Sequence, residues 1–207
     1  MIAAIILAAG RGARFSSDGR NKLLEEFGGS PLLQRAVDAA LRSRAGETIV
    51  VTGWDHERVA SALACRSVTL VHNPHYAEGM ASTLRVGIAQ ACDAEGALIL
   101  LGDMPNVSST VLDLLIGTFE ETRASAVVPL RGGRRGNPVL IGRALFPRLS
   151  ELRGDIGARA LLRAALDVIE VDAGEDGVLI DVDRQDDLDA LRCCEPSFSG
   201  PIGSEKI

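Results

Sequence analysis

The sequence predicts an α/β fold: a Rossmann-like, mostly parallel sheet with helices on both faces. Short runs of aliphatic and β-branched residues alternate with segments of helical periodicity, which is typical of parallel strands joined by crossover helices. The composition, 46% hydrophobic but only 3% aromatic, supplies a sizeable core of Leu, Val, Ile and Ala. We expect one domain over residues 1–192, with a lobe at residues 131–166, and a tail over residues 193–207.

The predicted elements follow in chain order. Strands are expected at about residues 3–7, 48–52, 68–71, 97–101, 126–129, 139–141, 168–171 and 178–183. Helices are expected at about residues 30–41, 59–63, 81–92, 109–119, 143–149 and 157–166, and from residue 185 onward. Ser30 suits the N-cap of the first helix, with Pro31 at its first position. Asp155 suits the N-cap of the helix that follows it.

Charge and cysteine content narrow the class of protein. The net charge of −6 argues against general binding of nucleic acid or of an anionic membrane, so local basic clusters indicate one specific anionic ligand. The four cysteines form no C-x-x-C pair, which favours reduced thiols. The apolar start, residues 1–9, is too short to span a membrane and lacks the features of an export signal. We therefore expect a cytoplasmic protein.

The stretch after the first strand is the first candidate site. Residues 3–7 lead directly into Ala8-Ala9-Gly10-Arg11-Gly12-Ala13-Arg14, with Lys22 downstream. Small residues let backbone N–H groups approach an anion, and basic side chains add the opposite charge, so the stretch suits a triphosphate or is an ordinary turn. The dinucleotide fingerprint fits poorly because Phe15 stands where its third glycine belongs. The P-loop pattern fails because Lys22 follows Asn21.

The amino-acid pattern of this stretch resembles the signature of a known protein family. Leu7-Ala8-Ala9-Gly10-x-x-x-Arg14-Phe15, with Lys22 downstream, is similar to the nucleotidyltransferases of molybdenum cofactor biosynthesis, and most of all to their cytidylyltransferase branch. The resemblance implies a fold like that of the nucleotide-diphospho-sugar transferases. Residues 16–18 make the loop longer than the family pattern. The nucleotide-binding residues that the resemblance implies here are Leu7, Ala8, Ala9, Gly10, Gly12, Arg14 and Lys22, the last two also catalytic.

Two further segments suit the same ligand. Asp103 follows the clearest buried strand, residues 97–101, and ligands in open α/β sheets lie beyond the carboxyl ends of strands. A carboxylate there is a natural Mg²⁺ ligand, although a turn aspartate before proline is also common. Residues 79–84 resemble the family's G-M-x-x-S-L element, and a helix starting there would aim N–H groups at an anion. The resemblance implies Gly79, Thr83 and Gly102 as nucleotide-binding residues.

The later segments resemble the family in the same order. Residues 102–105 match its G-D-Q-P element except at Met104, residues 154–159 match G-D-x-G-A-R, and Asp183 lies in a counterpart of D-I-D-T-P-E-D-L. The resemblance implies that Asp103 is catalytic and that Asp103 and Asp183 hold Mg²⁺.

A basic segment, residues 131–138, is the candidate acceptor site. It holds three arginines within five residues, together with three glycines. It is either a solvated hairpin turn or a mobile loop that captures a phosphate or pterin group of a second substrate. The family carries a comparable G-x-P-V element, so the resemblance implies that Arg134, Arg135 and Asn137 bind the acceptor.

Together these segments imply a Mg²⁺-dependent transfer of a nucleotidyl group from an NTP, with release of pyrophosphate. We expect CTP as donor and molybdopterin as acceptor, with a molybdoenzyme under maturation as a possible partner. Ala9 stands where the guanylyltransferases have glycine, and its methyl group would narrow the pocket against a purine unless it packs beneath the turn. The alternatives are a guanylyltransferase or other small-acceptor nucleotidyltransferase, a non-catalytic nucleotide-binding maturation factor, and an NAD-binding oxidoreductase.

Overall fold

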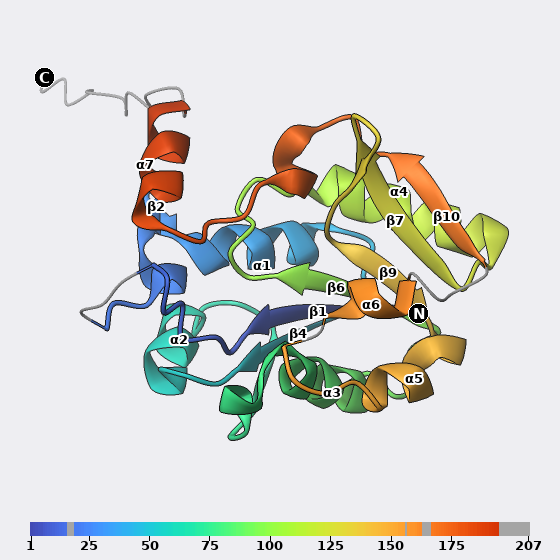
Figure 1. Ribbon diagram of the computed structural model, residues 1–207, viewed down its shortest axis with the longest axis horizontal. Coiled ribbons are helices and arrows are strands. Elements are labelled where there is room, and N and C mark those ends of the chain that lie inside the picture. Colours follow the sequence, from blue (N-terminus) through green and yellow to red (C-terminus); the bar gives the residue numbers. More distant parts are fainter. Residues whose placement is uncertain (16–18, 156, 163–166, 195–207) are drawn as a thin grey trace, which may run out of the picture.

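The fold is built on one large, mostly parallel sheet. The computed structural model describes residues 1–15, 19–155, 157–162 and 167–194. The sheet has eight strands. Their spatial order is β10 (Val168–Asp172), β7 (Ala126–Arg131), β9 (Val139–Gly142), β6 (Gly96–Leu101), β1 (Ile2–Ala8), β4 (Glu47–Thr52) and β5 (Thr69–His72), with β8 (Arg134–Arg135) paired to β7. Strand β9 runs antiparallel to β6 and β7, and β8 to β7, while the other pairs are parallel (Figure 1). The predicted mostly parallel α/β sheet is therefore confirmed.

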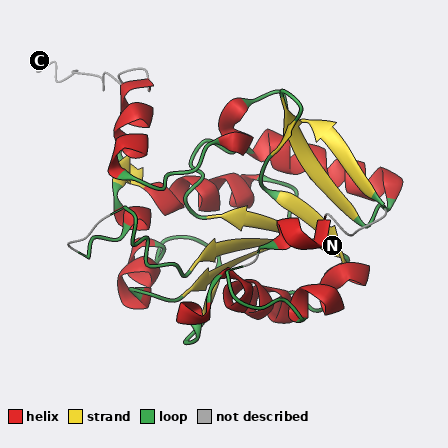
Figure 2. Cartoon of the chain, in the orientation of Figure 1, coloured by secondary structure: helices red, strands yellow, loops and turns green. Residues whose placement is uncertain are grey.

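Helices cover both faces of this sheet (Figure 2). One face packs against α1 (Leu32–Arg42), α2 (His56–Ala62) and α4 (Ser109–Thr122). The other packs against α3 (Met80–Gln90), α5 (Phe146–Ser150) and α6 (Ala158–Leu162). Because β1 lies between β4 and β6 and under helices on both sides, its aliphatic run is almost entirely buried.

A smaller cluster joins the segment of residues 15–32 to the segment of residues 182–188. Helix α7 (Gln185–Cys194) stands beside the two-stranded pair β2 (Glu26–Phe27) and β3 (Ser30–Pro31) (Figure 1). The cluster's buried side chains are Phe15, Phe27, Leu32, Val182 and Leu188. The guanidinium of Arg192 also donates to the carbonyl of Glu26, at 2.6 Å from Nη2. These contacts hold the segment before α7 against the N-terminal loop.

Two local predictions were wrong. Helix α1 begins at Leu32 with Pro31 as its N-cap, because Ser30 pairs with Phe27 in the β2–β3 pair and so is not available as a cap. Residues 178–183 do not form a strand. A 3₁₀ turn at Asp176–Leu179 leads into an extended segment, in which the Val182 N–H donates to the carbonyl of Asp103 at 3.0 Å. This segment crosses the strand ends instead of joining the sheet.

The described residues of the expected lobe, up to residue 162, are continuous with the large sheet and its helical layer. Strand β9 lies inside the large sheet, between β6 and β7, and α5 and α6 pack on the sheet's face. Residues 163–166, where the predicted helix was expected to end, lie outside the described residues. The same is true of the loop residues 16–18 and of the tail beyond residue 194. No helix in the described ranges is both long enough and apolar enough to cross a membrane.

Candidate nucleotide-binding site

The N-terminal loop is tied to the ends of the neighbouring strands. The carbonyl of Leu7 accepts from the Gly102 N–H at 3.1 Å, and that of Ala9 accepts from the Trp54 N–H at 3.1 Å. The loop therefore lies over the carboxyl ends of β6 and β4, where a ligand site is expected in an open α/β sheet.

Two residues of this loop fix the direction of Lys22. Asn21 is buried, and its side-chain oxygen accepts from the Leu23 N–H at 3.1 Å, which caps the 3₁₀ turn Lys22–Leu24. Gly12 has φ +60°, and a Cβ there would lie 3.3 Å from Cγ of Lys22. The missing side chain of Gly12 thus leaves room for the stem of Lys22, which points into the protein.

The ammonium group of Lys22 binds three oxygen atoms. Nζ lies 2.6 Å from Oδ2 of Asp103, 2.8 Å from the carbonyl oxygen of Val182 and 3.5 Å from Oδ1 of Asp183. Only 12% of the Lys22 side chain is exposed, so these contacts are shielded from solvent. Arg14 adds an ion pair to Asp183, with Nη1 2.9 Å from Oδ2, although its own side chain is 73% exposed. Four residues predicted for catalysis or metal binding therefore meet at one point.

Backbone contacts bring the two carboxylates together. Asp103 follows β6, and the Val182 N–H donates to its carbonyl. Asp187 then fixes the turn into α7, because its Oδ2 accepts from the Asp183 N–H at 3.0 Å and from the Arg184 N–H at 2.7 Å. Asp187 thus acts as a helix cap.

A divalent cation fits these donors. Oδ1 of Asp103 is buried and has no hydrogen-bond partner among the described residues. Buried polar atoms are normally hydrogen-bonded, so this oxygen is suited to bind an ion or a water molecule. The described residues contain no group of three His, Cys, Asp or Glu side chains placed to hold a metal ion. Mg²⁺ commonly uses only one or two carboxylates, with phosphate oxygens and water as its other ligands. Asp103 and Asp183 are sufficient for that mode of binding.

Asp181 adds a third carboxylate, which was not among the predicted site residues. Partial burial raises the pKa of Asp181, and the negative charges of Asp103 and Asp183 raise this pKa further. Lys22 opposes the shift by lowering the same pKa. Burial is thus the main cause of the raised pKa, and the two neighbouring carboxylates add to it.

A cavity of about 380 Å³ opens beside this cluster. Tyr76 and Met80, which were not predicted as site residues, also line it. The predicted residues that line it are Leu7, Gly10, Gly12, Arg14, Lys22, Gly79, Thr83, Asp103 and Asp183. We call it the first cavity.

Three predicted nucleotide-binding residues do not line the first cavity. Ala8 and Ala9 are buried beneath the turn. The methyl group of Ala9 lies only 2.7 Å from the position that a Cβ on Gly53 would take, so it packs beneath the turn toward the segment after β4. A Cβ on Gly102 would lie 2.8 Å from Leu33, so the glycine is needed there for packing.

The amino end of α3 forms one wall of the first cavity. The Ala81 N–H donates to the carbonyl of Gly154 at 3.1 Å, and the Met80 N–H donates to Oδ1 of Asp155 at 3.3 Å. Asp155 therefore caps α3 and not the helix that follows it, so the predicted cap was wrong. No local pattern predicts this contact, because the capped helix lies 75 residues earlier in the chain.

Buried hydroxyl groups stiffen the same wall. Asn73 is fully buried, and its Nδ2 donates to Oγ of Ser82 at 2.9 Å and to Oγ1 of Thr83 at 3.2 Å. Thr83 therefore lines the first cavity with its hydroxyl oxygen already bonded to Asn73.

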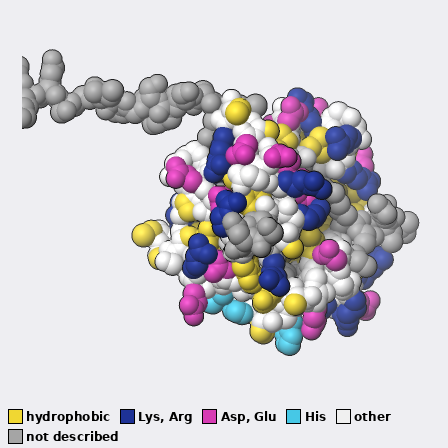
Figure 3. All heavy atoms as spheres, turned by 60° about the vertical axis from the view of Figure 1, so that its left-hand side comes forward, with side chains coloured by type: hydrophobic (Ala, Val, Ile, Leu, Met, Phe, Trp, Pro, Cys, Tyr) yellow, Lys and Arg dark blue, Asp and Glu magenta, His cyan; other side chains and the backbone are white. Residues whose placement is uncertain are grey.

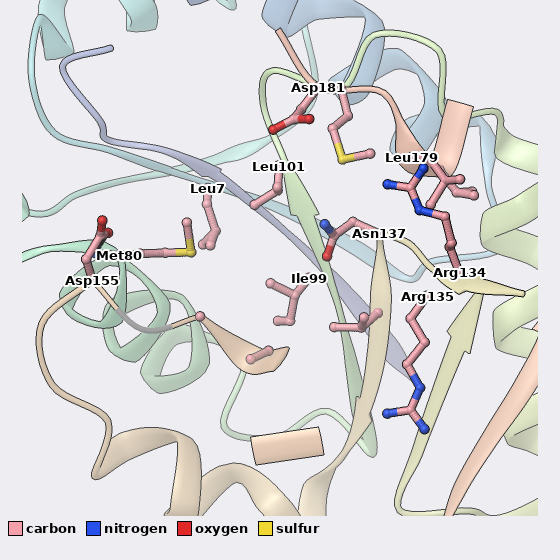
Figure 4. A pocket seen from close by; sticks show the side chains of 15 residues that line it. Leu7, Met80, Ile99, Leu101, Arg134, Arg135, Asn137, Asp155, Leu179 and Asp181 are labelled. Carbon is pink, nitrogen blue, oxygen red and sulfur yellow. Dashed lines mark hydrogen bonds between the residues drawn. The ribbon is translucent and has the colours of Figure 1, made fainter. Parts of the chain in front are cut away.

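A second cavity of about 390 Å³ adjoins the first. Figure 4 shows Met80 and Asp155 on one side of it, Arg134 and Arg135 on the other, and Leu7 and Leu101 between. Five residues line both cavities, namely Leu7, Met80, Leu101, Asp155 and Asp181. The two cavities therefore meet at a shared wall.

The basic segment is a hairpin and not a mobile loop. Strands β7 and β8 pair around Gly132 and Gly133, both with positive φ, as a two-residue hairpin turn requires. Nε of Arg135 donates to Glu170 on β10 at 2.5 Å, and Figure 4 shows Arg134 and Arg135 pointing in different directions. Within the described part of the chain Arg134 has no ion pair, and Asn137 points into the second cavity.

The remaining charges on this side of the molecule are mixed. Figure 3 shows Lys and Arg side chains interspersed with Asp and Glu, with no broad surface of one sign. The basic residues that matter for an anionic ligand are those at the cavities.

Most of the chain matches a known protein family. Residues 4–169 match the family model described as the MobA-like NTP transferase domain. The chain belongs to this family. It is a nucleotidyltransferase, as the matched family and a solved structure of 27% identity indicate.

Two curated relatives resemble most of the chain. A nicotine blue oxidoreductase from Paenarthrobacter nicotinovorans is 28% identical over 90% of this chain and 94% of the relative. The molybdenum cofactor cytidylyltransferase of Escherichia coli is 26% identical over 89% of this chain and 92% of the relative. The two relatives are about equally similar, so identity alone does not choose between their activities.

Solved structures agree on the fold. A nucleotidyl transferase from Methanothermobacter has a TM-score of 0.82 at 27% identity, covering 93% of this chain and 96% of that one. A manganese complex of Rv0371c from Mycobacterium tuberculosis has a TM-score of 0.77 at 26% identity, covering 94% and 99%. A structure of similar sequence thus holds a divalent metal.

The junction of Gly79 with Gly154 supplies a stability prediction. Gly79 has φ +101°, and a Cβ there would lie 2.5 Å from the backbone of Gly154. Gly79→Ala is therefore expected to lower the free energy of unfolding by about 2–4 kcal/mol, through backbone strain and a backbone clash. Gly154→Ala is the matched control: it has φ +69° but open space, so strain alone should cost about 1–2 kcal/mol. Urea unfolding measures both, and equal losses would contradict the close packing.

Asp181 supplies a pH-dependent prediction. Its raised pKa means that the charged carboxylate is less favourable in the folded than in the unfolded state, so it destabilises the fold at neutral pH. Asp181→Asn should therefore be more stable than the wild type at about pH 7, by less than about 1 kcal/mol because the group is open to solvent. The advantage should fade as the pH falls through the raised pKa, where Asp181 becomes neutral. Urea unfolding over this pH range is the test, and a less stable variant at neutral pH would refute the assignment.

Proposed function

We propose that this protein transfers the CMP group of CTP to a phosphorylated acceptor, molybdopterin, in a Mg²⁺-dependent reaction that releases pyrophosphate. The observation that carries the proposal is the cluster of Lys22, Asp103 and Asp183 beside two adjoining cavities. One cavity suits a nucleotide and the other an acceptor, as a two-substrate transfer requires.

The first cavity would hold the triphosphate. The small residues Gly10 and Gly12 allow the phosphates to approach the backbone, and Arg14 and Lys22 offset their charge. Asp103 and Asp183 would hold the metal ion, which neutralises charge on the phosphate oxygens when it is bound. The manganese complex of the mycobacterial relative supports a divalent metal in this family.

The second cavity would hold the acceptor. Arg134 is available for a phosphate group, whereas Arg135 is engaged with Glu170 and would act mainly by holding the hairpin in place. Asn137 offers both a donor and an acceptor to a heterocycle, and Met104 presents an apolar wall where the family typically has glutamine.

The reaction needs little covalent chemistry from the protein. An oxygen of the acceptor phosphate attacks the α-phosphorus of the NTP, the bond from that phosphorus to the bridging oxygen breaks, and pyrophosphate leaves. The attacking oxygen is already anionic, so no side chain has to remove a proton. The protein acts by positioning both substrates and by neutralising charge.

Cytidine and molybdopterin rest on likeness to one relative. The cytidylyltransferase of Escherichia coli supports both, as does the opening Leu7-Ala8-Ala9-Gly10. Because the methyl group of Ala9 packs toward Gly53, beneath the turn, it does not narrow the pocket, and cytidine is proposed from the likeness alone. A molybdoenzyme that receives the product would be the protein partner.

A second candidate function is oxidoreduction with a nicotinamide cofactor, which the name of the Paenarthrobacter relative favours. The site favours it less. Phe15, at the place of the third glycine of the dinucleotide fingerprint, is buried against Phe27 and Leu188. The loop also leads to a 3₁₀ turn at Lys22 instead of opening a helix at once, as that fingerprint requires.

Asp103→Asn tests the catalytic proposal. The variant should keep its fold but lose Mg²⁺-dependent release of pyrophosphate by about 10²-fold or more, the scale for one preorganised electrostatic contact. Asp93→Asn is the matched control, because Asp93 is exposed and precedes β6, at the opposite edge of the sheet. Normal turnover in Asp103→Asn would remove Asp103 from the site. No turnover in the wild type with any NTP and acceptor would favour a non-catalytic maturation factor.

Calorimetric titration tests the choice of nucleotide. With Mg²⁺ present, CTP should bind about 10–200-fold more tightly than GTP, the range for a steric difference within one pocket. Tighter GTP binding would indicate the guanylyltransferase alternative. NADH is the third ligand, and tight binding of NADH without binding of either NTP would favour the oxidoreductase.

A further inference from the structure

The inference concerns Lys22 and rests on the proposed nucleotide and metal site. Its ammonium group is surrounded by one oxygen of Asp103, one of Asp183 and the carbonyl oxygen of Val182, at 2.6–3.5 Å. A cation enclosed by two carboxylates and a carbonyl has the same kind of oxygen ligands as a hard metal ion. Lys22 therefore stands among the oxygen donors that the metal site would use.

We infer that Lys22 is the counter-ion of Asp103 and Asp183 and makes metal binding depend on the nucleotide. Without nucleotide it neutralises Asp103 and Asp183, and a metal ion must compete with it for the same oxygens. With a triphosphate bound, the phosphate oxygens give Lys22 other acceptors. Lys22 then releases the carboxylates as the metal and nucleotide enter together.

Electrostatics makes the competition strong. Two cations that share one carboxylate a few ångströms apart repel each other, and the shielding of Lys22 limits screening by water. Asp103 still offers Oδ1, which has no partner within the described residues, so a metal contact to this carboxylate remains possible once Lys22 has turned away. Both oxygens of Asp103 become available to a metal ion only after Lys22 moves.

The structure also gives Lys22 room to move. Its stem of four methylene groups packs against Gly12, where a Cβ would lie only 3.3 Å from Cγ and would hinder rotation of the stem. The triphosphate would lie in the same first cavity, which Gly12 and Lys22 both line. Rotation about the single bonds of the stem would pass the ammonium group from the carboxylates to phosphates in this cavity.

Thermodynamic linkage turns this arrangement into a measurable coupling. If nucleotide tightens metal binding by some factor, metal tightens nucleotide binding by the same factor. A residue that merely supports the fold would lower both affinities when removed. Lys22 as counter-ion predicts effects of opposite sign, because its loss frees the carboxylates for metal but deprives the triphosphate of a cation.

The test is Mn²⁺ binding, followed by electron paramagnetic resonance, to the wild type and to Lys22→Met. Without nucleotide, the variant should bind Mn²⁺ about tenfold or more tightly than the wild type, because a charged hydrogen bond no longer competes. The same variant should bind metal-free CTP about tenfold or more weakly. Arg11→Gln is the matched control: it removes one charge from the same loop, its side chain has no ion pair among the described residues, and it should leave Mn²⁺ binding unchanged.

Unchanged or weaker Mn²⁺ binding by folded Lys22→Met would overturn the inference. Lys22→Gln, a shorter polar variant, gives the same comparison should Lys22→Met not fold. The wild type supplies an independent measurement: CTP should tighten its Mn²⁺ binding about tenfold or more beyond the metal held by free CTP. Equal Mn²⁺ affinity with and without CTP would also refute the counter-ion. These are binding readouts, so they stay distinct from a failure of the proposed reaction, which would show as absent pyrophosphate release.

Discussion

The ion cluster at Lys22 is the interaction on which the arrangement of the site depends. Asp103 and Asp183 come from segments 80 residues apart, and their like charges would repel at this distance without a cation between them. One shielded ammonium group holds both. The cluster also joins the N-terminal loop to the strand end of β6 and to the segment before α7. The first cavity exists where these three segments meet.

The parts of this fold that the sequence could predict are those set by local pattern. Lys22 and Asp103 follow the apolar runs of β1 and β6. Their positions in the sequence therefore predicted two charged residues at one edge of a parallel sheet. Most helices and strands followed from periodicity for the same reason. Residues 178–183 alternate like a strand, yet their backbone groups bond to Asn137 and Asp103, so tertiary contacts decided their conformation.

The contacts that sequence reasoning missed join distant loops. Asp155 caps a helix that begins 75 residues before it, and Asp181 faces both cavities because the extended segment crosses the strand ends. Neither contact leaves a local signal. The one available hint for Asp181 was its place two residues before Asp183 in an acidic segment. Likewise, Ala9 reads as part of an exposed turn, and only the position of Gly53 shows that its methyl group is buried.

The charge of the first cavity argues for a divalent cation independently of any relative. Its described lining has two basic side chains, Arg14 and Lys22, and four acidic ones, Asp103, Asp155, Asp181 and Asp183. The lining is therefore net negative by two charges, and a triphosphate would add several more. Two cations cannot offset that sum, and the charges of Asp103 and Asp183 already add to the burial that raises the pKa of Asp181. A triphosphate can bind here only together with additional positive charge, which a metal ion held between the phosphates and Asp103 would supply. The same excess explains why Lys22 is drawn to the carboxylates when that charge is absent.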